Sequence, residues 1–312
     1  MKGYTMKALV GYTGFVGSNL ASQHVFDGLY HSRNIESAYD TKPDLLVYSG
    51  VRAEKFLANS DPEKDYGYVK DAMHNIEQIN PKSLILISTI DVYKNPLGVD
   101  EDSVMDTDDL HPYGLNRFYL EQWVREQYKD ALIVRLPALF GKNLKKNFIY
   151  DMIHIIPAML NEVKFTELSE KNNLIGEYYT KLDNGFYKLG EITQTQRAAL
   201  KEYFLSNGFT ALNFTDSRAG FQFYNLNYLW SNLMTAREKG IKILNINSEP
   251  IKAAEIYRSV TGSDFTNEVA KIVPDYDIKT KHDAVFGGNN GYMFSKESIL
   301  SDIQGYIKEH QS

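Results

Sequence analysis

The chain has 312 residues, 43% of them hydrophobic, which is enough for one large α/β domain with a smaller lobe. With 34 basic against 40 acidic residues, its formal charge of -6 does not provide the cationic face that nucleic-acid binding requires. No run approaches the roughly 20 apolar residues of a membrane span, and the glycine-rich N-terminus has too short an apolar run for a signal peptide. We therefore expect a cytoplasmic protein with neither a membrane nor a nucleic acid as its partner.

The absence of cysteine excludes disulfides, zinc–thiolate sites and thiol nucleophiles. No metal site is expected. The chemistry of the site must then come from hydroxyl, carboxylate, imidazole and cationic side chains or from a bound cofactor.

The first half of the chain alternates short apolar runs with helical segments. A helix is predicted after Gly17, through about His24, and another over 113–128. The predicted strands cover residues 7–10, 29–33, 44–48, 84–88 and 131–136. This alternation is typical of a parallel sheet covered on both faces, so the fold class is α/β with a Rossmann-type, doubly wound sheet.

The alternation of short strands and helices ends after Gly141, and residues 143–220 are predicted to be a long α+β insertion. Within it, Asn184-Gly185 between alternating runs indicates a hairpin over 178–189, and 194–207 has the pattern of an amphipathic helix. Further elements are expected at 221–224, 227–239 and 242–246. We predict a dinucleotide-binding domain at 1–142, an insertion or cap forming the substrate lobe at 143–220, and C-terminal elements at 221–312 shared between sheet and lobe.

Gly11, Gly14 and Gly17 form G-x-x-G-x-x-G between a predicted strand and a predicted helix. The first glycine permits a tight turn, the second lets the backbone approach a pyrophosphate, and the third allows close packing of helix on strand. The helix start adds free N–H groups and the positive end of the helix dipole. A dinucleotide is the expected ligand, and a glycine turn without a ligand is the alternative.

The segment GYTGFVGSNL resembles the T-G-x-x-G-F-x-G-x-x-L opening of the extended short-chain dehydrogenases, in particular the NAD-dependent epimerase/dehydratase family. STIDVY (88–93), HPYGLNRFYLEQ (111–122) and RLPALFG (135–141) are similar to later motifs of that family, in the same order. The resemblance covers nearly the whole chain apart from the insertion. It implies a Rossmann fold, a nicotinamide cofactor and a homodimer formed through the helix that begins near Tyr113, to which Phe118, Tyr119 and Trp123 could contribute.

The same resemblance implies which residues contact the cofactor. These are Gly11, Thr13, Gly14, Phe15, Val16, Gly17, Ser49, Gly50, Val51, Ser88, Tyr113, Arg117 and Pro137. The choice between NAD and NADP depends on the end of the second strand, where a carboxylate suits ribose hydroxyls and an arginine suits a 2′-phosphate. Arg33 stands there with no carboxylate beside it, which favours NADP unless Arg33 is simply a solvated surface residue.

The resemblance also implies a catalytic set of Thr89, Tyr113 and Arg117. Tyrosine, with an ordinary pKa of about 10, needs a nearby cation to act as a base at neutral pH, and residues four apart share one helix face. Thr89 would hydrogen-bond the substrate oxygen. Arg117 departs from the family's lysine, because its planar fork does not reproduce the contacts of an ammonium.

Two further departures narrow the reaction. Ile90-Asp91 stands where dehydratases of the family have an Asp-Glu pair, so epimerisation or keto reduction is favoured over dehydration. Ala138 occupies a position where several sugar-nucleotide enzymes have asparagine. Three hypotheses stay open. The first is an NAD(P)-dependent epimerase or keto-reductase of a nucleotide-activated sugar, and the second is a catalytically impaired cofactor-binding sensor or structural homologue. The third is a reductase of a small carbonyl compound without a diphosphate group.

The substrate lobe gives a less specific signal. Several cations could clamp a substrate diphosphate or could form a solvated charged face. They are Lys142, Lys145, Lys146, Arg197, Arg218 and Arg237. The insertion is expected either to cap the site or to form an interaction surface.

Overall fold

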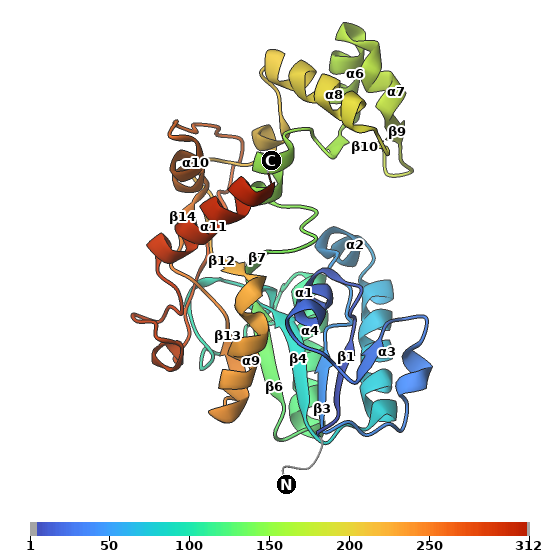
Figure 1. Cartoon of the computed structure of the whole chain (residues 1–312), viewed down its shortest axis with the longest axis vertical. Coiled ribbons are helices and arrows are strands. Elements are labelled where there is room, and N and C mark those ends of the chain that lie inside the picture. The colour runs from blue at the N-terminus through green and yellow to red at the C-terminus, as the bar shows by residue number, and fades with distance from the viewer. Residues whose placement is uncertain (1–4, 311–312) are drawn as a thin grey trace. The chain divides into compact units, whose positions relative to one another are not determined.

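A parallel sheet of six strands forms the centre of the first part of the molecule, in a computed structural model that describes residues 5–310 (Figure 1). Its order is β13-β6-β4-β3-β1-β2, and every neighbouring pair is parallel. The strands are β1 (Lys7–Val10), β2 (Gly28–Tyr30), β3 (Leu45–Tyr48), β4 (Leu84–Thr89), β6 (Leu132–Leu136) and β13 (Ile243–Asn245). The predicted α/β fold with a doubly wound parallel sheet is confirmed.

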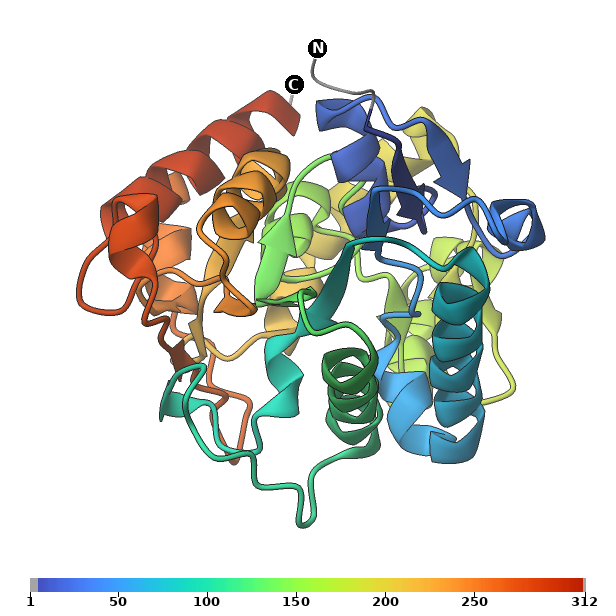
Figure 2. The same cartoon turned by 90° about the horizontal axis from the view of Figure 1, so that it is seen from below.

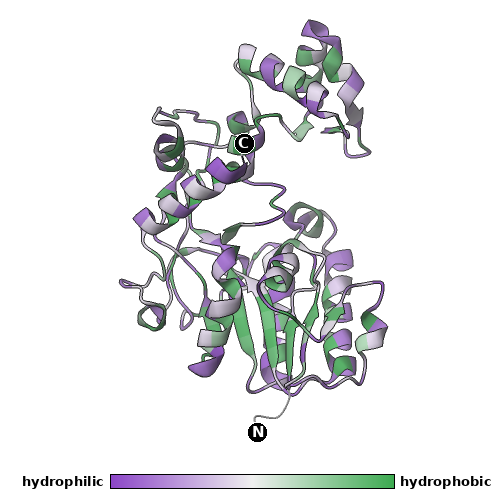
Figure 3. Ribbon diagram, in the orientation of Figure 1, coloured by the Kyte–Doolittle hydropathy of each residue, from purple (hydrophilic) through white to green (hydrophobic). Residues whose placement is uncertain are grey.

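Helices cover both faces of this sheet because its strands are apolar on both sides (Figures 2 and 3). On one face, α1 (Phe15–Gln23) and α9 (Leu229–Glu238) pack against side chains such as Leu9, Val47 and Val134. On the other, α3 (Pro62–Ile79) and α4 (Pro112–Gln127) pack against Val10, Leu46 and others. The carboxyl ends of parallel strands meet at one edge, which is where the glycine turn and the Thr89 segment lie.

Most predicted elements are present, with altered boundaries. The predicted strand 29–33 is wrong beyond Tyr30, because a turn begins there and leads into the 3₁₀ helix at Ile35–Ala38. The strand expected at 221–224 is divided into β11 (Gly220–Phe221) and β12 (Phe223–Asn225), and β12 pairs with β7 (Ala138–Phe140). Short elements that periodicity did not single out include α2 (Lys55–Ser60), β5 (Leu97–Val99), the 3₁₀ helix Ile90–Val92 and β15 (Asp277–Ile278).

Among the described residues, a second compact unit comprises 145–219, 252–273 and the chain from 303 to 310, and the first unit comprises the chain from 5 to 144, 220–251 and 274–302. Boundaries thus fall at 144 and 219, and the range predicted as shared C-terminal elements contributes to both units. The second unit contains α5 (Phe148–His154), β8 (Met159–Leu160), α6 (Glu162–Lys171), α7 (Asn173–Tyr178) and α8 (Gln194–Ser206), together with α10 (Ala253–Thr261) and the end of α11 (Lys296–His310).

The insertion has a small core of its own. Leu160, Leu168, Ile175, Leu200 and Phe204 are buried together, which explains how a segment without a place in the main sheet can fold. The predicted hairpin is present as antiparallel β9 (Tyr179–Lys181) and β10 (Tyr187–Leu189), and Gly185 in its turn has φ +83°, which glycine adopts readily.

This second unit should be more stable in mild acid. Burial raises the pKa of Asp151 to about 7, so the folded state holds a proton that the unfolded chain, titrating near the ordinary carboxyl pKa, releases. Stability should therefore fall as pH rises from about 4 to about 7, by at most about 4 kcal/mol from this group. Thermal unfolding at pH 5 and pH 8 should differ less for Asp151→Asn than for the unsubstituted chain; an equal pH dependence would refute this role of Asp151.

Candidate active site

The glycine turn connects β1 to α1 with the geometry that its sequence predicts. Gly11 has φ +90°, and a Cβ on it would lie 2.5 Å from the carbonyl oxygen of Ser49. A Cβ on Gly17 would lie 2.1 Å from the carbonyl oxygen of Gly11. The turn and the helix thus touch backbone to backbone, which brings the first N–H groups of α1 to the carboxyl edge of the sheet.

We predict that Gly17→Ala weakens cofactor binding without unfolding the sheet. The added methyl must displace the turn backbone, and the loss of even one hydrogen bond from an N–H group to a phosphate corresponds to roughly a tenfold weaker Kd. Gly67→Ala is the matched control, because Gly67 lies within α3 and its Cβ would meet nothing within 4 Å. Calorimetric titration with NADPH and NADH measures both variants, and undiminished binding by Gly17→Ala would contradict this account of the turn.

The neighbouring strand ends extend this edge. Ser49 follows β3 and is fixed by its own N–H and hydroxyl, which both donate to the carbonyl oxygen of Val10 at 3.0 and 2.9 Å. Gly50 and the half-buried Val51 come next. Arg33 has an exposed side chain in the turn after β2. These positions remain predicted cofactor contacts, as do Thr13, Gly14, Phe15, Val16 and the buried Pro137.

Thr89 and Tyr113 are brought together at the carboxyl end of β4. Thr89 ends that strand, and its hydroxyl accepts a hydrogen bond from the Asp91 N–H at 3.1 Å, which starts the 3₁₀ helix Ile90–Val92. Tyr113 lies in the first turn of α4. Gly114 lets this helix come close, since a Cβ there would lie 2.1 Å from the Asp91 carbonyl oxygen.

The pKa of Tyr113 is held above its ordinary value, primarily by burial; its side chain is only 8% exposed. Arg117 and a hydrogen bond with Thr89 lower that pKa, whereas the negative charges of Asp91 and Asp65 raise it. Burial and the nearby charges together therefore set how readily this phenol can lose its proton.

Arg117 does not reach outward as the family's lysine would. Its guanidinium forms a buried ion pair with Asp65 of α3 and donates to the Arg52 carbonyl oxygen at 2.5 Å and to that of Tyr113 at 3.3 Å. Its Cζ lies 4.0 Å from the centroid of the Tyr113 ring, over the ring face. Side-chain exposure is 5% for Arg117 and 6% for Asp65, so this cation joins α3 to α4 inside the protein.

Several motif residues form a buried polar network beside the site. Ser88, predicted to contact the cofactor, donates its hydroxyl proton to Glu121 at 2.5 Å. Glu121 forms a buried ion pair with Arg135, which donates to the Tyr93 hydroxyl at 2.7 Å. The family motifs that contain Ser88, Tyr93, Glu121 and Arg135 thus support the site by joining β4, α4 and β6.

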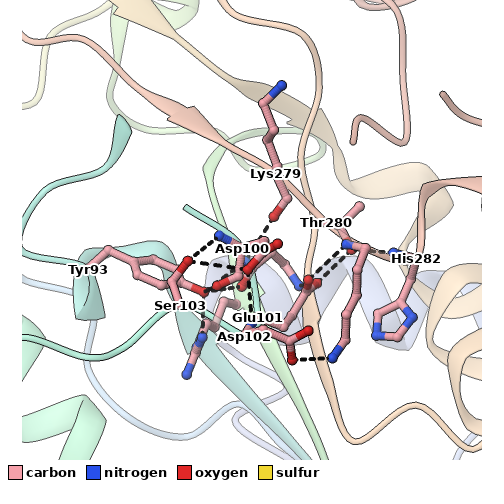
Figure 4. A network of polar contacts seen from close by, with 11 residues as sticks. Tyr93, Asp100, Glu101, Asp102, Ser103, Lys279, Thr280 and His282 are labelled. Carbon is pink, nitrogen blue, oxygen red and sulfur yellow. Dashed lines mark hydrogen bonds and ion pairs between the residues drawn. The ribbon is translucent and has the colours of Figure 1, made fainter. Parts of the chain in front are cut away.

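This network continues toward the loop after β5 (Figure 4). Tyr93 donates to the Asp100 carbonyl oxygen and pairs with Asn245 of β13. Glu101 accepts from the Asn245 N–H at 2.8 Å and from the Thr280 hydroxyl at 2.6 Å. Acidic residues in this loop are therefore engaged in fastening segments 97–103 and 277–282 together.

The structure does not bring together all the cations that were predicted to bind a substrate diphosphate. Arg218 is paired with Asp216 and Glu268 inside the second unit. Arg237 lines a hollow of about 470 Å³ with Lys82 and Lys242, at the amino ends of β4 and β6 and thus the edge opposite to the glycine turn. Lys142 lies in the first unit, whereas Lys145, Lys146 and Arg197 lie in the second.

Two residues that the sequence analysis did not assign lie beside Asp91. The ammonium of Lys55, the first residue of α2, is 2.5 Å from Asp91 Oδ1, and Nε2 of His111 is 3.8 Å from the same oxygen. His111 caps α4 through Nδ1, which accepts from the Gly114 N–H at 3.1 Å. The position of His111 directly before Pro112-Tyr113 could have identified it from the sequence, whereas no local sequence pattern identifies Lys55.

The parallel sheet and the glycine turn define a Rossmann-type α/β protein. The model of the family described as NAD dependent epimerase/dehydratase matches residues 29–177. This match covers slightly less than half of the chain, and over that range the chain is similar to the family. No match was found among curated proteins.

Solved structures share the fold at low sequence identity. The dTDP-4-dehydrorhamnose reductase from Yersinia enterocolitica is 14% identical, with 99% of this chain and 100% of that chain covered and a TM-score of 0.64. The corresponding reductase from Bacillus anthracis, in complex with NADP, is 14% identical with 98% and 99% covered and a TM-score of 0.62. The Bordetella bronchiseptica enzyme WbmG, in complex with NAD and UDP, is 14% identical with 99% and 96% covered and a TM-score of 0.63.

Among the helices between residues 5 and 310, none combines the length and apolar character needed to cross a bilayer.

Proposed function

We propose that this protein is an NAD(P)-dependent epimerase or keto-reductase that acts on a nucleotide-activated sugar. The observation that carries the proposal is the placement of Thr89, at the end of β4, and Tyr113, in the first turn of α4, at the same sheet edge as the glycine turn. Tyr113 exchanges the proton of the substrate hydroxyl or carbonyl oxygen, and Thr89 orients that oxygen.

The residues at the sheet edge fit a dinucleotide. The glycine turn leaves the backbone open where a Cβ would collide, and α1 directs its first N–H groups toward that position. A nicotinamide group, when bound, supplies or accepts the hydride. Exposed Arg33 supports NADP over NAD because it lies after β2, where a 2′-phosphate would need a cation.

The nucleotide-sugar assignment rests on the family and on the structural neighbours. Two of these neighbours are described as dTDP-4-dehydrorhamnose reductases, and a third was solved with UDP. The insertion, with its own core, is the part of the chain that we propose contributes substrate specificity.

A catalytically impaired cofactor-binding sensor is the second candidate, and the engagement of Arg117 with Asp65 favours it. The two functions differ in turnover. Incubation with NADPH and a nucleoside-diphosphate ketosugar should oxidise NADPH, or incubation with oxidised cofactor and a nucleoside-diphosphate sugar should yield an epimer visible by proton NMR without net cofactor change. Cofactor binding with neither outcome, across uridine and thymidine derivatives, would favour the sensor.

We also propose a homodimer formed through α4. Tyr119 on this helix is 44% exposed and is available for such a contact, whereas Phe118 is 7% exposed and packs with Ile90 and Val92 instead. Sedimentation of the unsubstituted chain and of Tyr119→Lys would test the dimer.

A further inference from the structure

The site needs a positive charge that Arg117 does not supply alone. Arg117 is paired inside the protein with Asp65, whose charge offsets part of the effect of Arg117 on Tyr113. Asp91 Oδ2, in contrast, lies 3.5 Å from the Thr89 hydroxyl, and the negative charge of Asp91 raises the pKa of Tyr113 beyond the effect of burial. An uncompensated Asp91 would oppose ionisation of Tyr113.

Lys55 lies where it can offset this charge. Its ammonium contacts Asp91 Oδ1 at 2.5 Å, on the side of the carboxylate away from Thr89, and its side chain is 42% exposed. Asp91 is only 20% exposed, so the pair is less screened than a fully solvated one. The contact joins α2 to the segment after β4, across 36 residues of sequence.

We propose that Lys55 is a positioning residue of the active site, which acts through Asp91 to supply the counter-charge for proton exchange at Tyr113. Lys55 thereby takes over part of the role that the family assigns to the lysine replaced here by Arg117. This inference rests on the function proposed above and deepens it by adding a residue to the proton-exchange centre.

Other titratable groups surround Asp91 and must be counted. His111, at the start of α4, faces the same oxygen as Lys55. Burial lowers the pKa of His111, the charge of Lys55 lowers it further, and Asp91 raises it. Burial raises the pKa of Tyr276, Asp91 raises it further, and Lys55 lowers it. The charges of the Asp65–Arg117 pair also act on the pKa of Tyr113. The pKa of His111 therefore reports the charge of the Lys55–Asp91 pair.

The first experiment reads that charge without substrate. Labelled histidine Cε1 resonances are titrated by NMR in the unsubstituted protein and in Lys55→Met, with His111→Asn used to assign the signal among the seven histidines. Removal of the ammonium should raise the pKa of His111 by roughly 0.5–1, because Asp91 then stabilises the imidazolium alone. Lys55→Arg should restore the original value.

Lys82→Met is the matched control. Lys82 forms a similar ion pair with Asp44 at 2.8 Å, but it lies just before β4, at the amino edge of the sheet. This control should leave the pKa of His111 unchanged. An unmoved His111 in Lys55→Met, or an equal movement in Lys82→Met, would overturn the proposal.

The second experiment measures the effect on Tyr113. In the carbinol-oxidising direction, Lys55→Met should shift the pH–rate profile upward and reduce kcat/KM at pH 7 by roughly tenfold, with cofactor Kd unchanged. Because Lys55 acts through Asp91, adding Lys55→Met to an Asp91→Asn variant should move the profile no further. A further shift in the double variant would contradict action through Asp91. If the unsubstituted protein turns over no substrate, the proposed function fails, and the His111 titration still decides whether the Lys55–Asp91 charge pair exists.

Discussion

Tyr113→Phe is expected to reduce turnover by on the order of 10²–10⁴ while leaving cofactor affinity unchanged. The hydroxyl is the only group removed, and it is the group that exchanges the proton beside Thr89. The ring stays buried under the Arg117 guanidinium, so the local packing survives. Steady-state kinetics and calorimetry on the same preparation separate the loss of chemistry from any loss of binding.

Tyr119→Phe is the control for this substitution. It removes the same atom from the same helix, but Tyr119 is 44% exposed and packs edge-on against Tyr66, away from β4. Its turnover should match that of the unsubstituted protein. Retention of full turnover by Tyr113→Phe would remove Tyr113 from the acid/base role and would mean that another group exchanges the proton.

Arg117→Met is expected to lower the free energy of unfolding by about 3–5 kcal/mol, because it leaves the carboxylate of Asp65 buried without its cation. Arg117→Lys should cost less, since the charge remains, but a lysine cannot reach Asp65 and the carbonyl oxygen of Arg52 with one planar group. Urea unfolding followed by circular dichroism measures both variants.

The double variant Asp65→Leu/Arg117→Met tests whether the unpaired carboxylate of Asp65 causes this loss of stability. Replacing both charges by apolar groups should recover most of the stability that Arg117→Met alone loses. A loss below about 1 kcal/mol in Arg117→Met would mean that the ion pair is not structural. Arg117 would then be free to serve the cofactor as the resemblance implies.

Local signals predicted the sheet and the glycine turn well. Gly11 and Gly17 are required by contacts within a few residues of themselves or on the adjacent strand, so their spacing alone carries the geometry. The hairpin at Asn184-Gly185 is equally local. Each of these features depends on backbone conformation that one residue type adopts best.

The charged residues of the site could not be predicted in this way, because their partners are distant in sequence. Arg117 is turned inward by Asp65, 52 residues before it, and Lys55 meets Asp91 through a short helix that periodicity does not detect. Arg237 resembled a possible phosphate ligand in the sequence, yet α9 carries it to the amino edge of the sheet. The direction of a long cationic side chain follows from the tertiary fold rather than from spacing.

The proposed function requires first that the chain binds a nicotinamide cofactor. Calorimetry with NAD, NADH, NADP and NADPH, together with a test for copurified cofactor, measures this binding on the purified chain. We predict binding of at least one nicotinamide cofactor, with preference for NADP and NADPH that Arg33→Ala reduces. Retained cofactor would indicate an epimerase-type cycle, and freely exchanging NADPH a reductase. If none of the four binds, the glycine turn is not a dinucleotide site in this chain, and both the enzyme and the sensor proposals fail.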